Sequence, residues 1–411
     1  MWQIGTPITG YYHGPGGGTD RWGPLTHGMA QKLVDGGFNL AWGCTVEDLD
    51  VAHEHGLRVD LIGLYTTDPT VLDDPDAKSR MDSVIDSVKD HPALYSYNVS
   101  DEPSAARFPE FARLLDYFRE RDPDHLAYIN LFPTYASAEA LGTEGDTTDA
   151  YKDHLRQYIQ IVKPDLISYD HYQLRADRDD DEYFLNLGLV REASLNAGVP
   201  FINVVQACSL GPTHRVPTGD EGRYLAYTTL AYGGQGLSQF VYWIRVPDFI
   251  GGGVAKYADG PFNAERAAAD AAAPLTPLGE ALRQINPEFV AVAEQLQPLT
   301  SLSVCYSGKA PAGGAVEPLP AAGLFGLDPL DAAADESILW GFFSPTAGNP
   351  THALVVNLDY AHEIATMAVG PGSMEEFDAE RRSWHPVSDG SRAQLTLAPG
   401  GGKLLRLQGR A

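Results

Sequence analysis

Two acidic residues, Asp101 and Glu102, stand side by side where an apolar and aromatic segment ends, and Pro103 follows them. A third acid, Asp170, lies near the end of a similar segment, Asp165 to Tyr172. Two carboxyl groups held close together can divide a reaction between them, one donating a proton and the other acting as nucleophile or base. Glu102 and Asp170 are therefore the candidate catalytic pair.

Alternation along the first segment predicts which acid faces inward, because successive strand side chains point to opposite faces. Three small polar residues share the phase that suits the interior of a closed sheet: Ser96, Asn98 and Ser100. Glu102 continues that phase unless a bulge intervenes, so it is expected to point into the open end of the closed sheet, its mouth. Asp101 is expected to point away from it. Acids at strand ends also cap helices, and this structural interpretation is the favoured one for Asp101.

Asp170 and Glu221 are the other acids that could reach such a site. Asp170 shares its phase with Ser168 and Tyr172, which places it at the same mouth. Glu221 follows Thr218 by three residues immediately before a helical pattern, as in a capping box. A structural role is therefore favoured for Glu221, and contact with a substrate remains open.

Aromatic and amide side chains gather at the ends of the same segments or in the loops after them. Flat apolar rings and hydrogen-bonding groups around two acids are what a sugar pocket needs. The predicted substrate-binding residues are Tyr12, Trp42, Tyr65, Asn98, Asp101, Asn130, Tyr135, His171, Tyr172, Gln206, Glu221 and Trp243.

Eight strand-like segments alternate with helical ones through the first three hundred residues. The predicted strands are Ile8 to His13, Phe38 to Cys44, Arg58 to Tyr65, Ala93 to Ser100, Leu126 to Phe132, Asp165 to Tyr172, Pro200 to Ala207 and Leu237 to Ile244. This number of units is typical of the α/β class and its (β/α)8 TIM barrel, in which functional groups sit at the carboxyl ends of the strands. The Gly-rich run after the first strand lacks GxGxxG and is read as a rim loop.

The pattern changes near Pro298 to short strands separated by Gly, Pro and Asn turns, which predicts a small C-terminal antiparallel β-sandwich. The predicted domains are a catalytic barrel over residues 1–297 and the sandwich over 298–411.

Charge and composition limit the partners. The chain has 29 basic and 55 acidic residues, a net charge of −26, which disfavours nucleic acid and anionic membranes. No apolar run is long enough to span a membrane, and the scattered histidines and three cysteines show no metal-binding spacing. We expect no cofactor or metal, a carbohydrate substrate, possible homo-oligomers, and a cytoplasmic location, or secretion if a signal peptide has been removed.

The motif Asp101-Glu102-Pro103 resembles the Asn-Glu-Pro-like motif that closes strand four in TIM-barrel glycoside hydrolases of the clan A type. The segment Thr218 to Trp243 is also similar to uncharacterised bacterial barrels of this kind. The resemblance implies an O-glycosidase in which Glu102 is the acid. It also implies a nucleophilic glutamate at the end of strand seven, where this chain has Gln206.

That departure leaves the second carboxylate open. Asp170 could supply it, a water activated by Asp170 or Asp101 could attack with inversion, or Glu221 could move in. Two other functions are considered: a metal-dependent sugar isomerase or epimerase, and a carbohydrate-binding barrel without catalysis.

Overall fold

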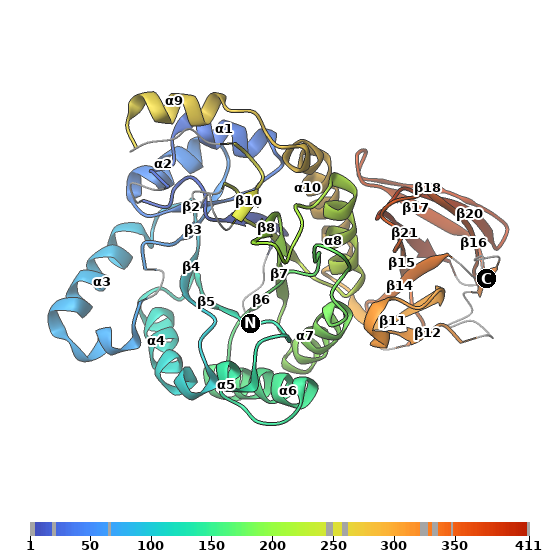
Figure 1. The fold of residues 1–411 in the computed structure, drawn as a ribbon, viewed down its shortest axis with the longest axis horizontal. Helices are drawn as coiled ribbons and strands as arrows, with labels where there is room; N and C mark the ends of the chain where they lie inside the picture. Colours follow the sequence, from blue (N-terminus) through green and yellow to red (C-terminus); the bar gives the residue numbers. More distant parts are fainter. Residues whose placement is uncertain are drawn as a thin grey trace.

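The computed structural model describes residues 5–18, 22–64, 67–243, 250–256, 262–320, 328–330, 336–346 and 348–408. Figure 1 shows a ring of strands surrounded by helices, with a second body of strands beside it.

Eight parallel strands form the ring, in the order β1-β9-β7-β6-β5-β4-β3-β2. Their bounds are β1 Ile8–Tyr12, β2 Leu40–Gly43, β3 Arg58–Leu61, β4 Leu94–Asp101, β5 Leu126–Leu131, β6 Ile167–His171, β7 Phe201–Gln206 and β9 Gly236–Phe240. The amide of Asn39, just before β2, donates to the carbonyl of Thr9 in β1 at 3.1 Å, so the two ends of the sheet approach each other. The predicted ring of eight parallel strands, nearly closed into a barrel, is confirmed, and each predicted strand range overlaps one of its strands.

Ten α-helices accompany the barrel in the described part of the chain. They are α1 His27–Asp35, α2 Val46–Glu54, α3 Pro75–Val88, α4 Phe108–Arg121, α5 Ala138–Leu141, α6 Thr147–Gln157, α7 Tyr183–Ala197, α8 Gly219–Ala231, α9 Ala264–Ala272 and α10 Pro277–Leu296. Local sequence explains their starts: Thr218 and Glu221 form the capping box of α8, and Thr276 caps α10 ahead of Pro277. None of the described helices is long and apolar enough to cross a membrane.

Two short strands lie at the barrel mouth outside the ring. β8 (Cys208–Leu210) follows β7 directly and pairs antiparallel with β10 (Ile250–Gly252), which comes from the connection after β9. The pair ties the loops after β7 and β9 together above the barrel.

The C-terminal region contains a seven-stranded sheet, β12-β11-β14-β15-β21-β17-β18, and a four-stranded sheet, β13-β16-β20-β19. The bounds are β11 Thr300–Gly308, β12 Glu317–Pro318, β13 Asp328–Leu330, β14 Ser337–Ser344, β15 His352–Asn357, β16 Ile364–Val369, β17 Met374–Asp378, β18 Ser383–Pro386, β19 Ser388–Asp389, β20 Arg392–Leu397 and β21 Gly402–Leu407. Apart from the short parallel pair β11 and β12, the pairings are antiparallel, as predicted. One hydrophobic cluster takes Trp340 from the larger sheet and Leu395 from the smaller.

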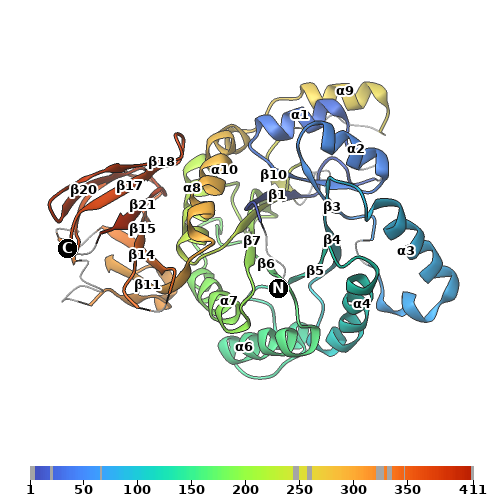
Figure 2. The ribbon, with the colours of Figure 1, turned by 180° about the vertical axis from the view of Figure 1, so that it is seen from behind.

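The larger sheet also packs on the barrel through α8. Figure 2 shows this sheet beside α8 and α10. Phe343 and Val356 of the sheet belong to the same hydrophobic cluster as Leu225 and Leu230 of α8. The predicted boundary after residue 297 falls between the end of α10 at Leu296 and the start of β11 at Thr300.

Candidate active site

A β-bulge in β4 decides how its two terminal acids point. Asn98 pairs with Tyr128 of β5 and Ser100 with Ile129, so Val99 is an extra residue in β4. The bulge changes the phase, and Asp101 pairs in register with Asn130. Asn130 donates from Nδ2 to Asp101 at 3.1 Å, so Asp101 faces the mouth. The prediction that Asp101 points away is wrong, because alternation was counted without the bulge.

Glu102 also faces the mouth, through an unusual backbone turn. Its φ is 46°, in the left-handed region that costs a non-glycine residue of order 1 kcal/mol. Its amide donates to the carbonyl of Asn130 at 2.8 Å. Its carboxyl group shares a hydrogen bond with that of Asp170, at the end of β6. The structure therefore brings the two predicted catalytic residues together and adds Asp101 beside them.

Burial and mutual repulsion make this pair hold a proton. Burial first, and then the charge of Asp101, raises the pKa of Glu102 to about 7. Burial, followed by the charges of Glu102 and Asp101, raises the pKa of Asp170 well above its ordinary value. A hydrogen bond between two carboxyl groups is strongest when one proton is shared, so the pair titrates as a unit. Near neutral pH the pair can still supply a proton.

A second polar layer lies deeper in the barrel, around Asp60 of β3. The hydroxyl groups of Ser96 and Tyr128 donate to its carboxylate at 2.7 and 2.8 Å, and Nδ2 of Asn98 lies 3.3 Å from it. Burial raises the pKa of Asp60 to about 6. Sequence reasoning missed this residue, although an acid inside an apolar strand segment was the available signal.

Asn98 and Tyr12 belong to this deeper layer. Asn98 is fully buried, and its Nδ2 also lies 3.3 Å from the hydroxyl of Tyr12 and 3.1 Å from that of Tyr128. Their predicted role in substrate binding is therefore not supported, because both side chains are buried and contact each other inside the barrel.

The walls of the mouth are aromatic. Tyr172 stacks on Phe240 with ring centroids 4.9 Å apart, and its amide donates to the hydroxyl of Tyr135 at 3.3 Å. Tyr135 is 36% exposed, so its ring is available to a ligand. The charge of Asp170 contributes, after burial, to raising the pKa of both Tyr135 and Tyr172, which places both hydroxyl groups close to the acids.

Three other predicted binding residues are buried. Trp42 packs edge-on against Tyr12, and Trp243 against Tyr242. His171 is fully buried, and its Nδ1 lies 2.9 Å from Oδ1 of Asn186. Tyr65 lies outside the described residues.

Gln206, where the resemblance implied a nucleophile, ties loops together. Its Oε1 accepts from the amide of Leu174 at 2.9 Å, and its Nε2 lies within 3.1 Å of the carbonyls of Leu174, Cys208 and Arg215. Both amide hydrogens are used by backbone, so its predicted contact with substrate is not supported.

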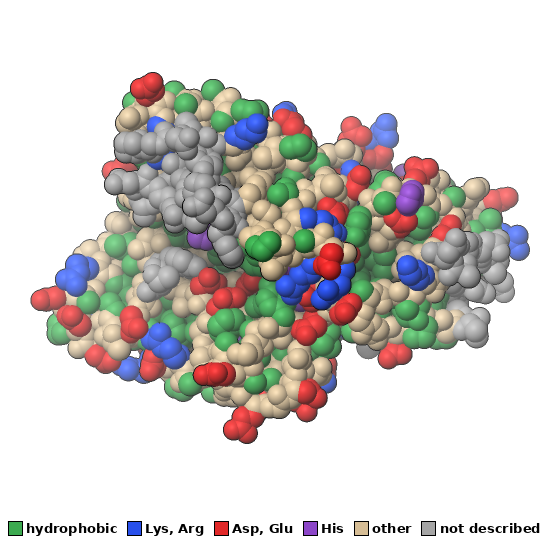
Figure 3. All heavy atoms as spheres, viewed as in Figure 1, with side chains coloured by type: hydrophobic (Ala, Val, Ile, Leu, Met, Phe, Trp, Pro, Cys, Tyr) green, Lys and Arg blue, Asp and Glu red, His purple; other side chains and the backbone are tan. Residues whose placement is uncertain are grey.

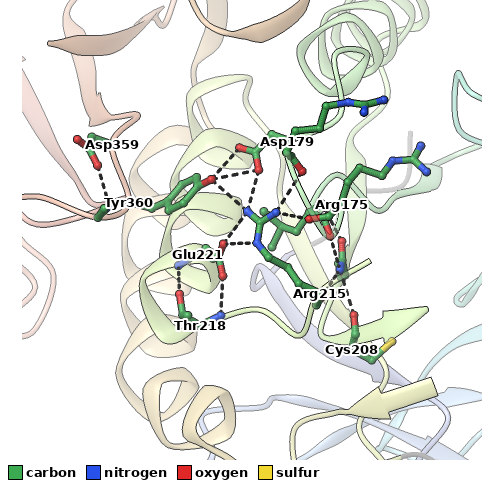
Figure 4. A network of polar contacts seen from close by, with 12 residues as sticks. Arg175, Asp179, Cys208, Arg215, Thr218, Glu221, Asp359 and Tyr360 are labelled. Carbon is green, nitrogen blue, oxygen red and sulfur yellow. Dashed lines mark hydrogen bonds and ion pairs between the residues drawn. The ribbon is translucent and has the colours of Figure 1, made fainter. Parts of the chain in front are cut away.

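Glu221 is likewise structural. It accepts from the amide of Thr218 at 2.8 Å and from Arg215 at 2.7 Å, and Figure 4 shows it turned toward Arg215 in a network that reaches Tyr360 of the C-terminal region. Its predicted contact with substrate is not supported, because both carboxylate oxygens are used by this network.

The visible barrel face differs in charge between its centre and the side toward the C-terminal region. Figure 3 shows acidic side chains near its centre, beside the grey residues, and a mixed group of basic and acidic side chains toward the C-terminal region. Among the residues that the structure describes, no group of three or more His, Cys, Asp or Glu side chains could hold a metal ion.

Comparisons with known proteins show the fold. No protein-family model matches the chain, and no curated protein sequence matches it either. A solved structure titled "Glycoside hydrolase" is 10% identical, with a TM-score of 0.54, and the match covers 98% of this chain and 92% of that one. A family 5 glycoside hydrolase from Bacteroides vulgatus is 12% identical, with a TM-score of 0.53, covering 97% and 89%. The expected likeness to TIM-barrel glycoside hydrolases is confirmed as a likeness of fold over nearly the whole chain.

Proposed function

We propose that the protein hydrolyses O-glycosidic bonds, with Glu102 as general acid and Asp170 as the second carboxylate. One observation carries the proposal: two acids at the carboxyl ends of β4 and β6 share a hydrogen bond, and burial raises both pKa values. A carboxylic acid that keeps its proton near neutral pH is what protonation of a leaving alcohol requires. The fold of the glycoside hydrolases described above supports this choice.

In the proposed reaction Glu102 transfers its proton to the glycosidic oxygen as the bond from that oxygen to the anomeric carbon breaks. Asp170 then either attacks the anomeric carbon or takes a proton from a water that attacks it. Hydrogen-bonded carboxyl groups are closer than the roughly 5 to 9.5 Å at which catalytic pairs flank a sugar. Substrate must therefore part the two acids as it enters.

The aromatic walls support a carbohydrate as the substrate. The exposed ring of Tyr135 and the stacked pair Tyr172 and Phe240 offer flat apolar faces beside the acids. Sugar rings present C–H faces to such surfaces and hydroxyl groups to the carboxylates.

The test uses Glu102→Gln on a panel of aryl glycosides and oligosaccharides. Turnover of substrates with poor leaving groups should fall by roughly 10²–10⁴-fold, while dinitrophenyl glycosides, which need little protonation, should be affected far less. Glu120→Gln, which changes an exposed glutamate of α4, is the matched control and should leave turnover unchanged. Equal loss on both kinds of leaving group would contradict the acid role of Glu102.

The panel also separates the two other functions. A carbohydrate-binding barrel without catalysis would bind glycans and release no sugar from any of them. A sugar isomerase would convert free sugars into isomers and would lose that activity on dialysis against a chelator. Either result would replace the proposal.

A further inference from the structure

Asn130 of β5 contacts all three acids of the mouth. Its Nδ2 donates to Asp101 at 3.1 Å and to Asp170 at 2.9 Å, and its backbone carbonyl accepts from the amide of Glu102 at 2.8 Å. We propose that Asn130 is a positioning residue that fixes the three carboxylates relative to one another, and that it does not bind substrate. The inference rests on the proposed function only for its effect on turnover.

The orientation of the amide is fixed from the other side. The hydroxyl of Ser168 donates to Oδ1 of Asn130 at 2.8 Å, so Nδ2 must face the acids. Ser168 stands two residues before Asp170 on the same face of β6, so one strand supplies both the anchor of the amide and one of its acceptors.

These contacts use both donor hydrogens of the side chain. An amide group has two hydrogens, and here one goes to each of two carboxylates. The side chain is 3% exposed, so a sugar hydroxyl would have to displace an acid to reach it. The substrate contact predicted from the sequence, if made through Nδ2, would require a free donor hydrogen.

The amide also opposes repulsion among the acids. An N–H donated to a carboxylate favours its charged form, and the contact with Asn130 lowers the pKa of Asp170 against burial and the neighbouring charges. Six titratable groups surround Asp170 and act on it or are influenced by it: Asp101, Glu102, Tyr135, Tyr151, Tyr169 and Tyr172. None of them is a cation, so the hydrogen bond from the uncharged amide of Asn130 is a main interaction that lowers the pKa of Asp170.

The first test replaces Asn130 by leucine, which has a similar shape and no donors. We expect kcat to fall by roughly 10- to 100-fold with KM changed less than about threefold, because the acids lose their geometry and not their contact with substrate. The pH-rate profile should move toward higher pH by about one unit. A raised KM with unchanged kcat and pH profile would overturn the proposal and establish substrate binding.

Asn203→Leu is the matched control. Asn203 is a fully buried asparagine of the next barrel strand but one, and its Nδ2 donates to Thr229 of α8, away from the acids. This variant should lose stability and keep the wild-type pH profile.

A second variant, Ser168→Ala, only frees the amide of Asn130 to turn. It should shift the pH-rate profile in the same direction as Asn130→Leu by a smaller amount, and it replaces Asn130→Leu as the test if that variant does not fold. An unshifted profile in Ser168→Ala would count against the proposal.

A titration without substrate distinguishes this inference from the proposed function. The carboxyl carbons of ¹³C-labelled aspartate are followed by NMR, with the signal of Asp170 assigned by its loss in Asp170→Asn. The midpoint should move upward in Asn130→Leu, whether or not the protein hydrolyses any glycoside. An unchanged midpoint would overturn the positioning role, and absent turnover with a shifted midpoint would overturn only the proposed function.

Discussion

Two clusters of acidic side chains lie at the carboxyl ends of the barrel strands, and they differ in whether a cation is present. In the mouth, Asp101, Glu102 and Asp170 face one another and the amide of Asn130. In the network of Figure 4, Arg215 donates to Glu221 at 2.7 Å and to Asp179 at 2.8 Å. The same residue types are therefore placed in opposite electrostatic surroundings.

The pKa values follow this difference. Burial would raise the pKa of Asp180, next to the network, but its contacts with His171 and Arg175 hold it well below the usual range. Burial would lower the pKa of Arg215, but hydrogen bonds to Asp179 and Glu221 keep it raised. Asp180 is thus held as a charged group that stabilises structure, whereas Glu102 and Asp170 in the mouth exchange protons.

Removing an acid from the mouth should have the largest effect on activity. Asp170→Asn should lower kcat by roughly 10²–10⁴-fold, because the second carboxylate is lost. Its unfolding free energy should not fall, since a buried acid repelled by two others has been neutralised. Turnover and urea denaturation check this, and a variant with normal kcat would show that Asp170 is not catalytic.

Removing the cation of the network should lower stability and leave activity unchanged. Arg215→Met leaves two poorly exposed carboxylates without their partner and should cost about 3 kcal/mol of unfolding free energy, with kcat per folded molecule retained. Arg178→Met is the control, because that side chain is 67% exposed and 3.8 Å from Asp177, and it should change stability by less than about 0.5 kcal/mol. Equal effects of the two variants would contradict the network's role.

The two clusters should also give stability opposite dependences on pH. A carboxyl group whose pKa is raised in the folded protein destabilises the fold as it ionises. The ionisation of Glu102 should therefore reduce the unfolding free energy by about 2–3 kcal/mol between pH 4.5 and 7. The pKa of Asp180 is lowered, so its contribution is present above its unfolded pKa and is lost as pH falls.

Denaturation curves from pH 3 to 8 measure both effects. Glu102→Gln should reduce the loss of stability toward neutral pH, and Asp180→Asn should reduce the loss of stability toward acidic pH. Curves that match the wild type in slope at both ends would contradict the assignment of charges to the clusters.

The smallest effect is expected where the network meets the C-terminal region. The hydroxyl of Tyr360 donates to Asp179 at 3.1 Å, and Arg215 donates to that hydroxyl at 3.1 Å. Tyr360→Phe should cost about 1 kcal/mol, because Asp179 keeps its bond to Arg215. Thermal unfolding checks this, and a loss as large as that of Arg215→Met would mean that Tyr360 and not the arginine holds the network.

The strands, and with them the strand ends that carry Glu102 and Asp170, could be predicted because period-two patterning and turn residues are local signals. Glu102 reaches the mouth through its left-handed turn and not through the alternation that predicted it. The direction of the Asp101 side chain could not be predicted. The bulge at Val99 depends on pairing with β5 and is not visible in the alternation of polar and apolar residues in β4. Gln206 and Glu221 have polar side chains near strand or helix ends, where substrate-binding residues are expected. Their use by Leu174 and Arg215 arises from contacts between distant segments, which one sequence does not reveal.

Helix α8 has a consequence for how the molecule folds. Ten of its thirteen residues are buried, because the barrel covers one side and the larger C-terminal sheet covers the other. A helix apolar on both sides is stable only when both neighbours are present. We therefore expect the C-terminal region to unfold together with the barrel, in a single thermal transition.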